Sequence, residues 1–171
     1  MLKSKKINIG ISIGDPNGIG IEIILKVLSE SHLYEKCNFI IYSSLDLIVK
    51  QQDFFKITTL PLKKIDSLDK IASDHINIKE VFSSSKFEFG KNDKEISANG
   101  IISFKEAVED AKSKKIDILI TAPINKSLSY SSSFKFLGHT DYLKNLFNID
   151  PMMLMVSDNL KLGLLTEHIP L

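Results

Sequence analysis

The sequence predicts an α/β fold with a mostly parallel sheet and flanking helices. Short apolar segments of strand character alternate along the chain with amphipathic helical patterns, and the connections between them are short. One segment, IDILIT at 116 to 121, is a continuous apolar run, which is typical of a parallel strand covered by helices on both faces. A chain of 171 residues is long enough for one domain with a real core, or for part of a larger protein.

The first elements form a strand, a turn and a helix. INIGISI at 7 to 13 is predicted to be a buried strand, and GDPNG at 14 to 18 is rich in turn-forming residues. Apolar residues at helical spacing over 19 to 28 then predict an amphipathic helix.

A second strand and helix follow. FIIYS at 39 to 43 has strand character, and SLDLIVKQQ at 44 to 52 has the pattern of a short helix with Ser44 or Asp46 near its start. The next stretch, about 54 to 94, mixes strand candidates such as INIKEV with Ser, Lys and Asp. We expect it to be irregular, with a small antiparallel addition as one possibility.

Regular patterns return in the second half. Residues 97 to 115 predict a helix with one apolar face, and it leads into the strand at 116 to 121. HTDYLKNLF at 139 to 147 predicts a helix with Thr140 as its N-cap, and 152 to 157 and 161 to 166 predict two further strands.

Composition excludes several classes of protein. The apolar fraction of 43% and the charged fraction of 25% are those of an ordinary globular protein, and no run approaches the ~20 apolar residues that span a bilayer. The apolar run near the N-terminus is too short for a signal peptide, so we expect a cytoplasmic protein without a membrane segment. The single cysteine, Cys37, has no partner for an internal disulfide.

The charge pattern argues against a nucleic-acid partner. The net charge is +1 and the lysines are scattered rather than clustered. All 22 basic residues are lysine, and arginine is the usual bidentate ligand of phosphate and carboxylate. If the ligand is a phosphorylated acid, this chain therefore supplies only some of the groups that bind it.

Two loops after predicted strands carry candidate residues. Asp15, in the GDPNG turn, is either part of a tight turn at a helix start or a carboxylate that faces a site, and the spacing leaves both open. Lys126 follows a buried strand, at the edge of the sheet where open α/β folds bind ligands. The alternative for Lys126 is a solvated loop lysine.

Three further side chains are candidates. In GHTDYL, Gly138 permits close approach of the backbone, and His139 and Thr140 offer a ring nitrogen and a hydroxyl side by side. The alternative is a helix cap with an incidental histidine. His168, in LLTEHIPL, ends a predicted strand and is a candidate metal ligand or general base, or else a structural histidine.

Several blocks in order resemble one family. GDPNGIGIEI, ISANGIISFKEAVEDAKSKKIDILITAPINK, FLGHTDYL and LLTEHIPL are similar to segments of the 4-hydroxythreonine-4-phosphate dehydrogenase family of vitamin B6 (pyridoxine) biosynthesis. The resemblance runs through the whole chain but covers only the N-terminal half of the family's length. It implies that residues 1 to 171 are the N-terminal portion of a longer two-domain dehydrogenase, resembling isocitrate and isopropylmalate dehydrogenases in fold.

The resemblance also implies an activity. Members act as homodimers that use NAD to oxidise 4-phosphooxy-L-threonine, and the β-keto acid then loses carbon dioxide to give 3-amino-2-oxopropyl phosphate on the route to pyridoxal phosphate. A divalent metal cation, zinc, magnesium or cobalt, polarises the hydroxyl oxygen. His168 matches the first of three histidine metal ligands, His139 and Thr140 match substrate-contacting residues, and Asp15 and Lys126 receive no definite role.

The remaining ligands of the family lie in segments that this sequence does not contain. We therefore expect a chain that is inactive alone, as a fragment of a longer enzyme, as half of a split enzyme, or as a degenerate gene product. The competing hypotheses are a non-catalytic binding module of the same fold and a related dehydrogenase acting on another phosphorylated or hydroxylated acid.

Overall fold

The computed structural model describes residues 6–83, 86–129 and 134–165. The chain divides into two compact units, Met1–Phe134 and Lys135–Leu171.

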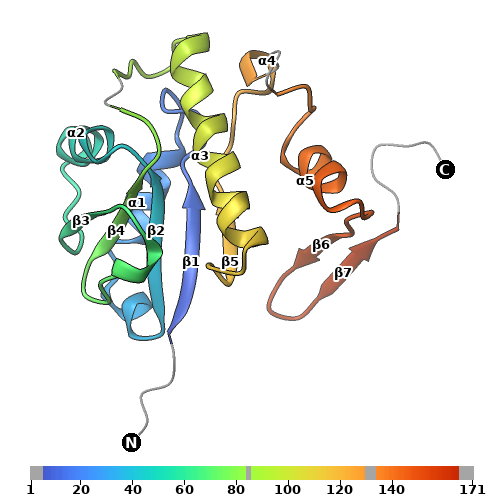
Figure 1. The fold of residues 1–171 in the computed structure, drawn as a ribbon, viewed down its shortest axis with the longest axis horizontal. Coiled ribbons are helices and arrows are strands. Elements are labelled where there is room, and N and C mark those ends of the chain that lie inside the picture. The colour runs from blue at the N-terminus through green and yellow to red at the C-terminus, as the bar shows by residue number, and fades with distance from the viewer. Residues whose placement is uncertain (1–5, 84–85, 130–133, 166–171) are drawn as a thin grey trace, which may run out of the picture. The chain divides into compact units, whose positions relative to one another are not determined.

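The first unit is built on one parallel sheet of five strands (Figure 1). The strands lie in the order β3-β4-β2-β1-β5, and every neighbouring pair is parallel. Their bounds are β1 (Ile7–Ser12), β2 (Cys37–Ser43), β3 (Leu62–Ile65), β4 (Ile76–Glu80) and β5 (Ile118–Thr121). The predicted α/β fold with a mostly parallel sheet is confirmed.

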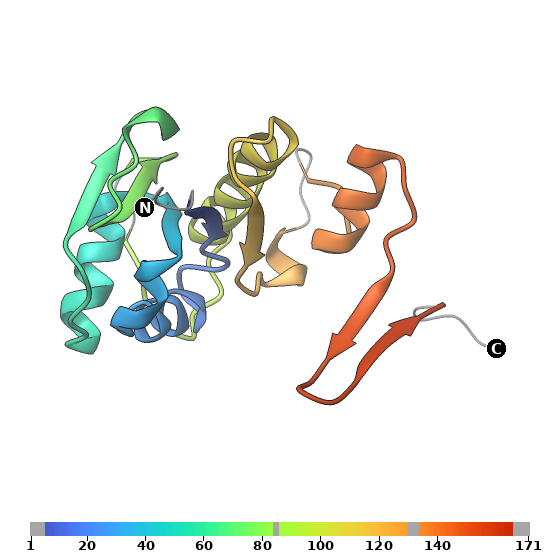
Figure 2. The same ribbon diagram turned by 90° about the horizontal axis from the view of Figure 1, so that it is seen from below.

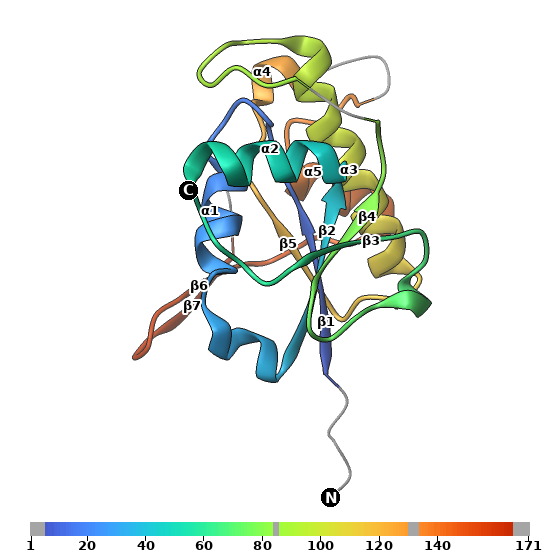
Figure 3. The same ribbon diagram turned by 90° about the vertical axis from the view of Figure 1, so that its left-hand side faces the viewer.

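Helices lie on both faces of this sheet. Helices α1 (Gly20–Val27) and α2 (Leu45–Phe55) cover one face, and α3 (Lys94–Lys112) covers the other (Figure 2). Figure 3 views the sheet from its β3 side, with α1 and α3 on opposite sides of the strands. The short elements are η1 (Ser31–Glu35), η2 (Leu68–Lys70) and α4 (Lys126–Ser129).

Two hydrophobic cores follow from the alternation of side chains along the strands. Ile9, Ile11 and Ile41 point toward α1 and α2 and belong to one buried cluster. Ile40 and Tyr42, one residue out of phase, belong to a second cluster on the α3 side. The near-continuous apolar strands of the sequence are explained by this burial on both faces.

Capping side chains set two helix starts. The Ser44 hydroxyl accepts a hydrogen bond from the Leu47 backbone N–H at 3.1 Å, so Ser44 rather than Asp46 is the N-cap of α2. The Asp93 carboxylate accepts from the N–H groups of Glu95 and Ile96 at 2.9 and 3.0 Å, and α3 begins at Lys94, three residues before the predicted start. Both caps accept hydrogen bonds from N–H groups in the first turn, which have no partner within the helix.

The prediction for residues 54 to 94 is wrong in its topology. β3 and β4 are parallel strands of the main sheet, and β4 lies between β2 and β3. The sequence signal was weak because each strand has only four or five residues, and Lys63 and Lys64 at the sheet edge are exposed. The buried apolar residues of these two strands are Ile65, Ile76 and Ile78.

The prediction that helices cover both faces of IDILIT is also wrong. Ile118 and Ile120 are each 46% exposed, whereas Leu119 packs against the core on the α3 side. β5 is an edge strand, and α1 lies over its neighbour β1, so one face of β5 is open.

The second unit contains α5 (His139–Phe147) and an antiparallel hairpin of β6 (Met153–Val156) and β7 (Lys161–Leu164). The predicted helix at 139 to 147 and the two strands are confirmed. The N-cap prediction is wrong: Gly138 is the N-cap, and Thr140 is the second residue of the helix.

A buried charge cluster ties α3 to the sheet. Asp110, only 3% exposed, accepts hydrogen bonds from the Tyr42 hydroxyl at 2.9 Å and from the Lys79 ammonium at 2.5 Å. Burial alone would raise the pKa of Asp110, but the bonds from Lys79 and Tyr42 outweigh it and hold that pKa below its ordinary value of 3.8. Burial and the Asp110 carboxylate both raise the pKa of Tyr42, which therefore stays protonated as the donor.

This cluster makes the stability of the chain dependent on pH. The pKa of Asp110 is lower in the folded state than in the unfolded state. The carboxylate therefore contributes fully to the free energy of unfolding at pH values above its unfolded-state pKa. This contribution is lost as the pH falls through its folded-state pKa. We expect Asp110→Asn to lower the free energy of unfolding by about 2 kcal/mol at pH 7, and by clearly less at pH 3. Urea unfolding of both chains at the two pH values measures the difference.

The matched control is Asp66→Asn. Asp66 forms an exposed ion pair with Lys70, so its substitution should leave the free energy of unfolding unchanged at pH 7. An Asp110→Asn effect equally large at both pH values would contradict the assignment.

Candidate functional site

The GDPNG turn links β1 to α1 at the carboxyl edge of the sheet. Gly14 has a φ of +69°, in the region that favours glycine, and a Cβ there would lie 2.3 Å from the carbonyl oxygen of Pro123. The next N–H, of Asp15, donates to that same carbonyl at 3.0 Å. The turn is therefore held directly against the TAPINK loop that follows β5.

The Asp15 carboxylate is engaged within the turn. One oxygen accepts from the Asn17 backbone N–H and the other from the Ser97 hydroxyl of α3, both at 3.0 Å, and the residue is 8% exposed. Of the two interpretations that the sequence left open, this geometry supports the tight turn at a helix start.

Asn17 is a connecting residue that the sequence analysis did not identify. Its side-chain oxygen accepts from the Glu88 N–H at 2.8 Å, and its side-chain nitrogen donates to the Lys91 carbonyl at 2.9 Å. The Gln51 side chain of α2 donates to the neighbouring Pro16 carbonyl at 2.8 Å. A DPNG turn predicts local bonds only, so no sequence signal pointed to these partners more than thirty residues away.

Helix α3 packs against the GDPNG turn at the carboxyl edge of the sheet. A Cβ at Gly100 would lie 2.2 Å from the carbonyl oxygen of Gly14, so only glycine permits this approach of helix and turn. The Ser103 hydroxyl accepts from the Ile13 N–H at 3.0 Å and donates to the Tyr42 carbonyl at 2.5 Å, bridging the ends of β1 and β2. Hydrogen bonds therefore fix the turn, helix α3 and the ends of β1 and β2 relative to one another at the carboxyl edge of the sheet.

Lys126 lies at this edge, as predicted from its position after a buried strand. It is the exposed first residue of α4. The preceding residue, Asn125, bonds to the Asn92 side chain at 3.0 Å and accepts at its carbonyl from the Ser129 hydroxyl at 2.7 Å. These bonds hold the loop from which the lysine projects.

His139 and Thr140 occupy the first turn of α5. His139 is half-buried and Thr140 is exposed. The Asp141 carboxylate accepts from the Leu137 N–H at 3.1 Å, which holds the preceding FLG segment against the helix start. The structure therefore places both residues in the first turn of α5, the end of a helix at which the dipole is positive.

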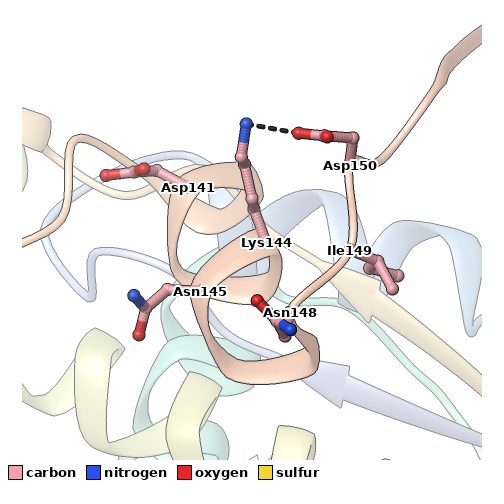
Figure 4. Close-up of a pocket in the computed structure, with 6 residues that line it drawn as sticks. All are labelled: Asp141, Lys144, Asn145, Asn148, Ile149 and Asp150. Atoms are coloured by element: carbon pink, nitrogen blue, oxygen red, sulfur yellow. Dashed lines mark ion pairs between the residues drawn. The ribbon is translucent and has the colours of Figure 1, made fainter.

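A polar hollow of about 290 Å³ lies at the other end of α5 (Figure 4). Asn148 ends the helix with a φ of 51°, and Asp150 then forms an ion pair with Lys144. This bond raises the pKa of Lys144. The Lys144 charge is thus neutralised within the unit, and none of the predicted site residues lines the hollow.

His168, the predicted metal ligand, lies outside the described residues. Within residues 6–83, 86–129 and 134–165, no three His, Cys, Asp or Glu side chains are close enough to hold a metal ion. Among the helices described, none is both long and apolar enough to cross a lipid bilayer.

The parallel sheet with helices on both faces defines an α/β protein, and comparison with known proteins gives its family. Residues 35–171 match the family model described as pyridoxal phosphate biosynthetic protein PdxA. The chain belongs to the PdxA family, and the resemblance drawn from its sequence blocks is confirmed.

Individual relatives agree with this assignment. The 4-hydroxythreonine-4-phosphate dehydrogenase of Sulfurihydrogenibium sp. is 32% identical over 96% of this chain and 51% of its own length. A Clostridium botulinum protein with the provisional name D-threonate 4-phosphate dehydrogenase is also 32% identical, over all of this chain and 52% of its own. The chain spans about half the length of the curated relatives it matches.

A solved structure supports the fold. The 4-hydroxythreonine-4-phosphate dehydrogenase of Burkholderia phymatum superposes with a TM-score of 0.84 at 25% identity, covering 98% of this chain and 52% of that one.

The structural role of Asp15 is testable by a pair of substitutions. Asp15→Ala removes both acceptors and leaves the Asn17 N–H without its partner, so we expect the free energy of unfolding to fall by about 2 kcal/mol. Asp15→Asn keeps an acceptor oxygen and should retain most of the stability. Equal losses in both variants, measured by urea unfolding, would show that the charge matters rather than the turn geometry.

The contact between α3 and the turn predicts the effect of one added methyl group. Gly100→Ala places a Cβ against the backbone of Gly14, which cannot move aside without breaking the Asp15 bonds, and we expect a loss of about 3 kcal/mol. Ala98→Ser, at an exposed position of the same helix, is the control and should change stability little. A neutral Gly100→Ala variant in thermal unfolding would refute the close approach.

Proposed function

We propose that this chain forms half of an NAD-dependent dehydrogenase that acts on a four-carbon hydroxy acid phosphorylated at C4, with 4-hydroxythreonine-4-phosphate as its substrate in vitamin B6 biosynthesis. The observation that carries the proposal is the match to the PdxA family over residues 35–171. Relatives named for this substrate cover nearly the whole chain. As an enzyme of vitamin B6 biosynthesis it would act in the cytoplasm.

D-threonate 4-phosphate is a second candidate substrate, because a relative named for it matches at the same identity. The two molecules share a carboxylate, a C3 hydroxyl and a C4 phosphate, and differ at C2, where one has an amine and the other a hydroxyl. Residues that contact the shared groups would bind both substrates. The preference for one substrate over the other therefore depends on the residues that contact C2.

The proposed chemistry is oxidation at C3. The C3 hydrogen leaves as hydride to NAD, the hydroxyl loses its proton, and the resulting β-keto acid releases its carboxylate as carbon dioxide. NAD supplies the hydride acceptor, and a divalent cation (zinc, magnesium or cobalt) would stabilise negative charge on the C3 oxygen.

This chain would contribute three groups to that site. We assign His139 and Thr140 to substrate binding, because both lie in the first turn of α5, where side-chain donors and helix N–H groups favour an anion. We assign His168 as one metal ligand on the basis of its sequence block. The other ligands would come from the second half of a family chain and from the partner subunit of a homodimer.

The absence of arginine agrees with a chain that supplies only part of the site for a phosphorylated acid. Lysine binds phosphate as a point charge and lacks the bidentate geometry that fixes a phosphorylated acid. One histidine does not hold a metal tightly, so the 171-residue chain alone should be inactive.

A chimera tests the activity. The second half of the Sulfurihydrogenibium relative, beyond the region aligned with this chain, is fused after Leu171. We expect the chimera to form NADH from one of the two phosphorylated substrates in the presence of NAD and a divalent cation, and the 171-residue chain to form none. NADH absorbance with each substrate measures the reaction and its preference.

Variants of the chimera test the assigned residues. His139→Ala should lower kcat/KM by about 100-fold through loss of a substrate contact, whereas His75→Ala, at a partly exposed site between η2 and β4, should leave it unchanged. Full-rate turnover by the 171-residue chain would contradict the proposal that this chain holds only part of the catalytic site. A folded chimera that turns over neither substrate would contradict the proposed function.

A further inference from the structure

Lys126 follows β5 at the point where the strand order of the sheet changes direction. From β1 the chain continues to β2, β3 and β4 on one side, and it then returns to the opposite side of β1 for β5. The helices follow the same division, because α1 and α2 cover one face of the sheet and α3 covers the other (Figure 2). Open α/β sheets bind ligands outside the carboxyl ends of the strands at such a reversal, so the loops after β1 and β5 are the expected site.

The two loops at this reversal are in direct contact. The loop after β1 is the GDPNG turn, and its Asp15 N–H donates to the Pro123 carbonyl in the loop after β5 at 3.0 Å. Residues 13–19 and 122–126 contain one acidic side chain, Asp15, whose carboxylate is already hydrogen-bonded within the turn and to α3. They contain one basic side chain, Lys126. Lys126 is therefore the cation that these two loops offer to a ligand.

The backbone that carries Lys126 is fixed, whereas its ammonium has no counter-ion. The Asn125 side chain donates to the Asn92 side-chain oxygen at 3.0 Å and accepts from the Ser127 hydroxyl at 2.7 Å. Lys126 itself is exposed, and it forms no ion pair with any residue in the described ranges 6–83, 86–129 and 134–165. An anionic ligand would therefore reach this ammonium without breaking an existing ion pair.

Local charge distinguishes Lys126 from the other lysines of this edge. Lys91 and Lys94 lie within two residues of Asn92, the partner of the TAPINK loop. Lys91 forms an ion pair with Glu88, and Lys94 stands between two acidic residues in the sequence. The neighbours of Lys126 are an asparagine and a serine, which are uncharged. A dianion would meet less repulsion at Lys126 than at either of the other two lysines.

We propose that Lys126 binds a phosphate group at this edge of the sheet. The proposed reaction contains two sources of phosphate, the C4 phosphate of the substrate and the pyrophosphate of NAD, so this inference rests on the proposed function. An ammonium group binds phosphate as a point charge with three donors, and it does not need the bidentate geometry of arginine. A lysine on a loop fixed by hydrogen bonds therefore suits a chain that contains no arginine.

Substitutions in the chimera described above test this contact. Lys126→Met removes the charge and keeps an unbranched side chain. Because a charge-assisted hydrogen bond is lost, we expect the KM of the phosphorylated ligand to rise by about 30-fold and kcat to change by less than about 3-fold. Lys126→Arg keeps the charge and should stay within about 5-fold of the unsubstituted KM. Lys94→Met is the matched control at the same edge and should leave both KM values unchanged.

The two sources of phosphate give different results. If Lys126 binds the C4 phosphate, KM for the substrate rises, and 4-hydroxythreonine without its phosphate is turned over equally by Lys126→Met and the unsubstituted chimera. If Lys126 binds NAD, KM for NAD rises instead. Unchanged KM values for both would overturn the proposal. An equal loss with the phosphorylated and unphosphorylated substrates, at an unchanged KM for NAD, would also overturn it, because Lys126 would then contact another group of the substrate.

A binding measurement on the 171-residue chain separates this inference from the proposed function. The chain is titrated with inorganic phosphate, and its backbone amides are followed by two-dimensional NMR. Millimolar phosphate should shift the signals of residues 125 to 127, and Lys126→Met, but not Lys94→Met, should remove these shifts. If the shifts occur and a folded chimera is inactive, the proposed function fails and the phosphate contact stands. If no shifts occur, or if both lysine variants behave alike, the assignment of Lys126 fails.

Discussion

The backbone contact between the GDPNG turn and helix α3 is the constraint on which the first unit depends. Gly14 and Gly100 bring a turn and a helix so close that neither position tolerates a Cβ. This approach puts the Ser97 hydroxyl on the Asp15 carboxylate and the Ser103 hydroxyl between β1 and β2. Each bond is worth about 1 kcal/mol, and together they orient the edge of the sheet.

The same hydrogen bonds connect the GDPNG turn to two further loops at this edge. Asn17 connects the turn to the segment around Glu88 and Lys91, and the Pro123 carbonyl connects it to the loop that leads to Lys126. A rigid carboxyl edge with loops of polar residues is the usual site of ligand binding in open α/β sheets. The Asp15 carboxylate bonds to Asn17 and Ser97 and thereby holds the turn in place.

Apolar surface is distributed unevenly over the two units. In the first, β2 buries apolar side chains on both of its faces, whereas β5 leaves Ile118 and Ile120 exposed on one face. In the second, the β6–β7 hairpin exposes Leu154 and Met155 on successive, opposite faces, and an isolated two-stranded hairpin is marginal in water. Both apolar surfaces lie in a chain that spans about half of its relatives' length.

The sequence by itself determined the fold class, most helix and strand positions, and the family. Strong periodicity and long apolar runs marked β1, β2, α3 and α5, and the ordered blocks around Asp15, Lys126 and His139 identified the relatives. Tertiary structure alone decided the parallel pairing of β3 and β4, the open face of β5, and the use of the Asp15 carboxylate. These depend on contacts between residues far apart in sequence, such as Asp15 with Ser97, and local patterns carry no information about which distant partner will be near.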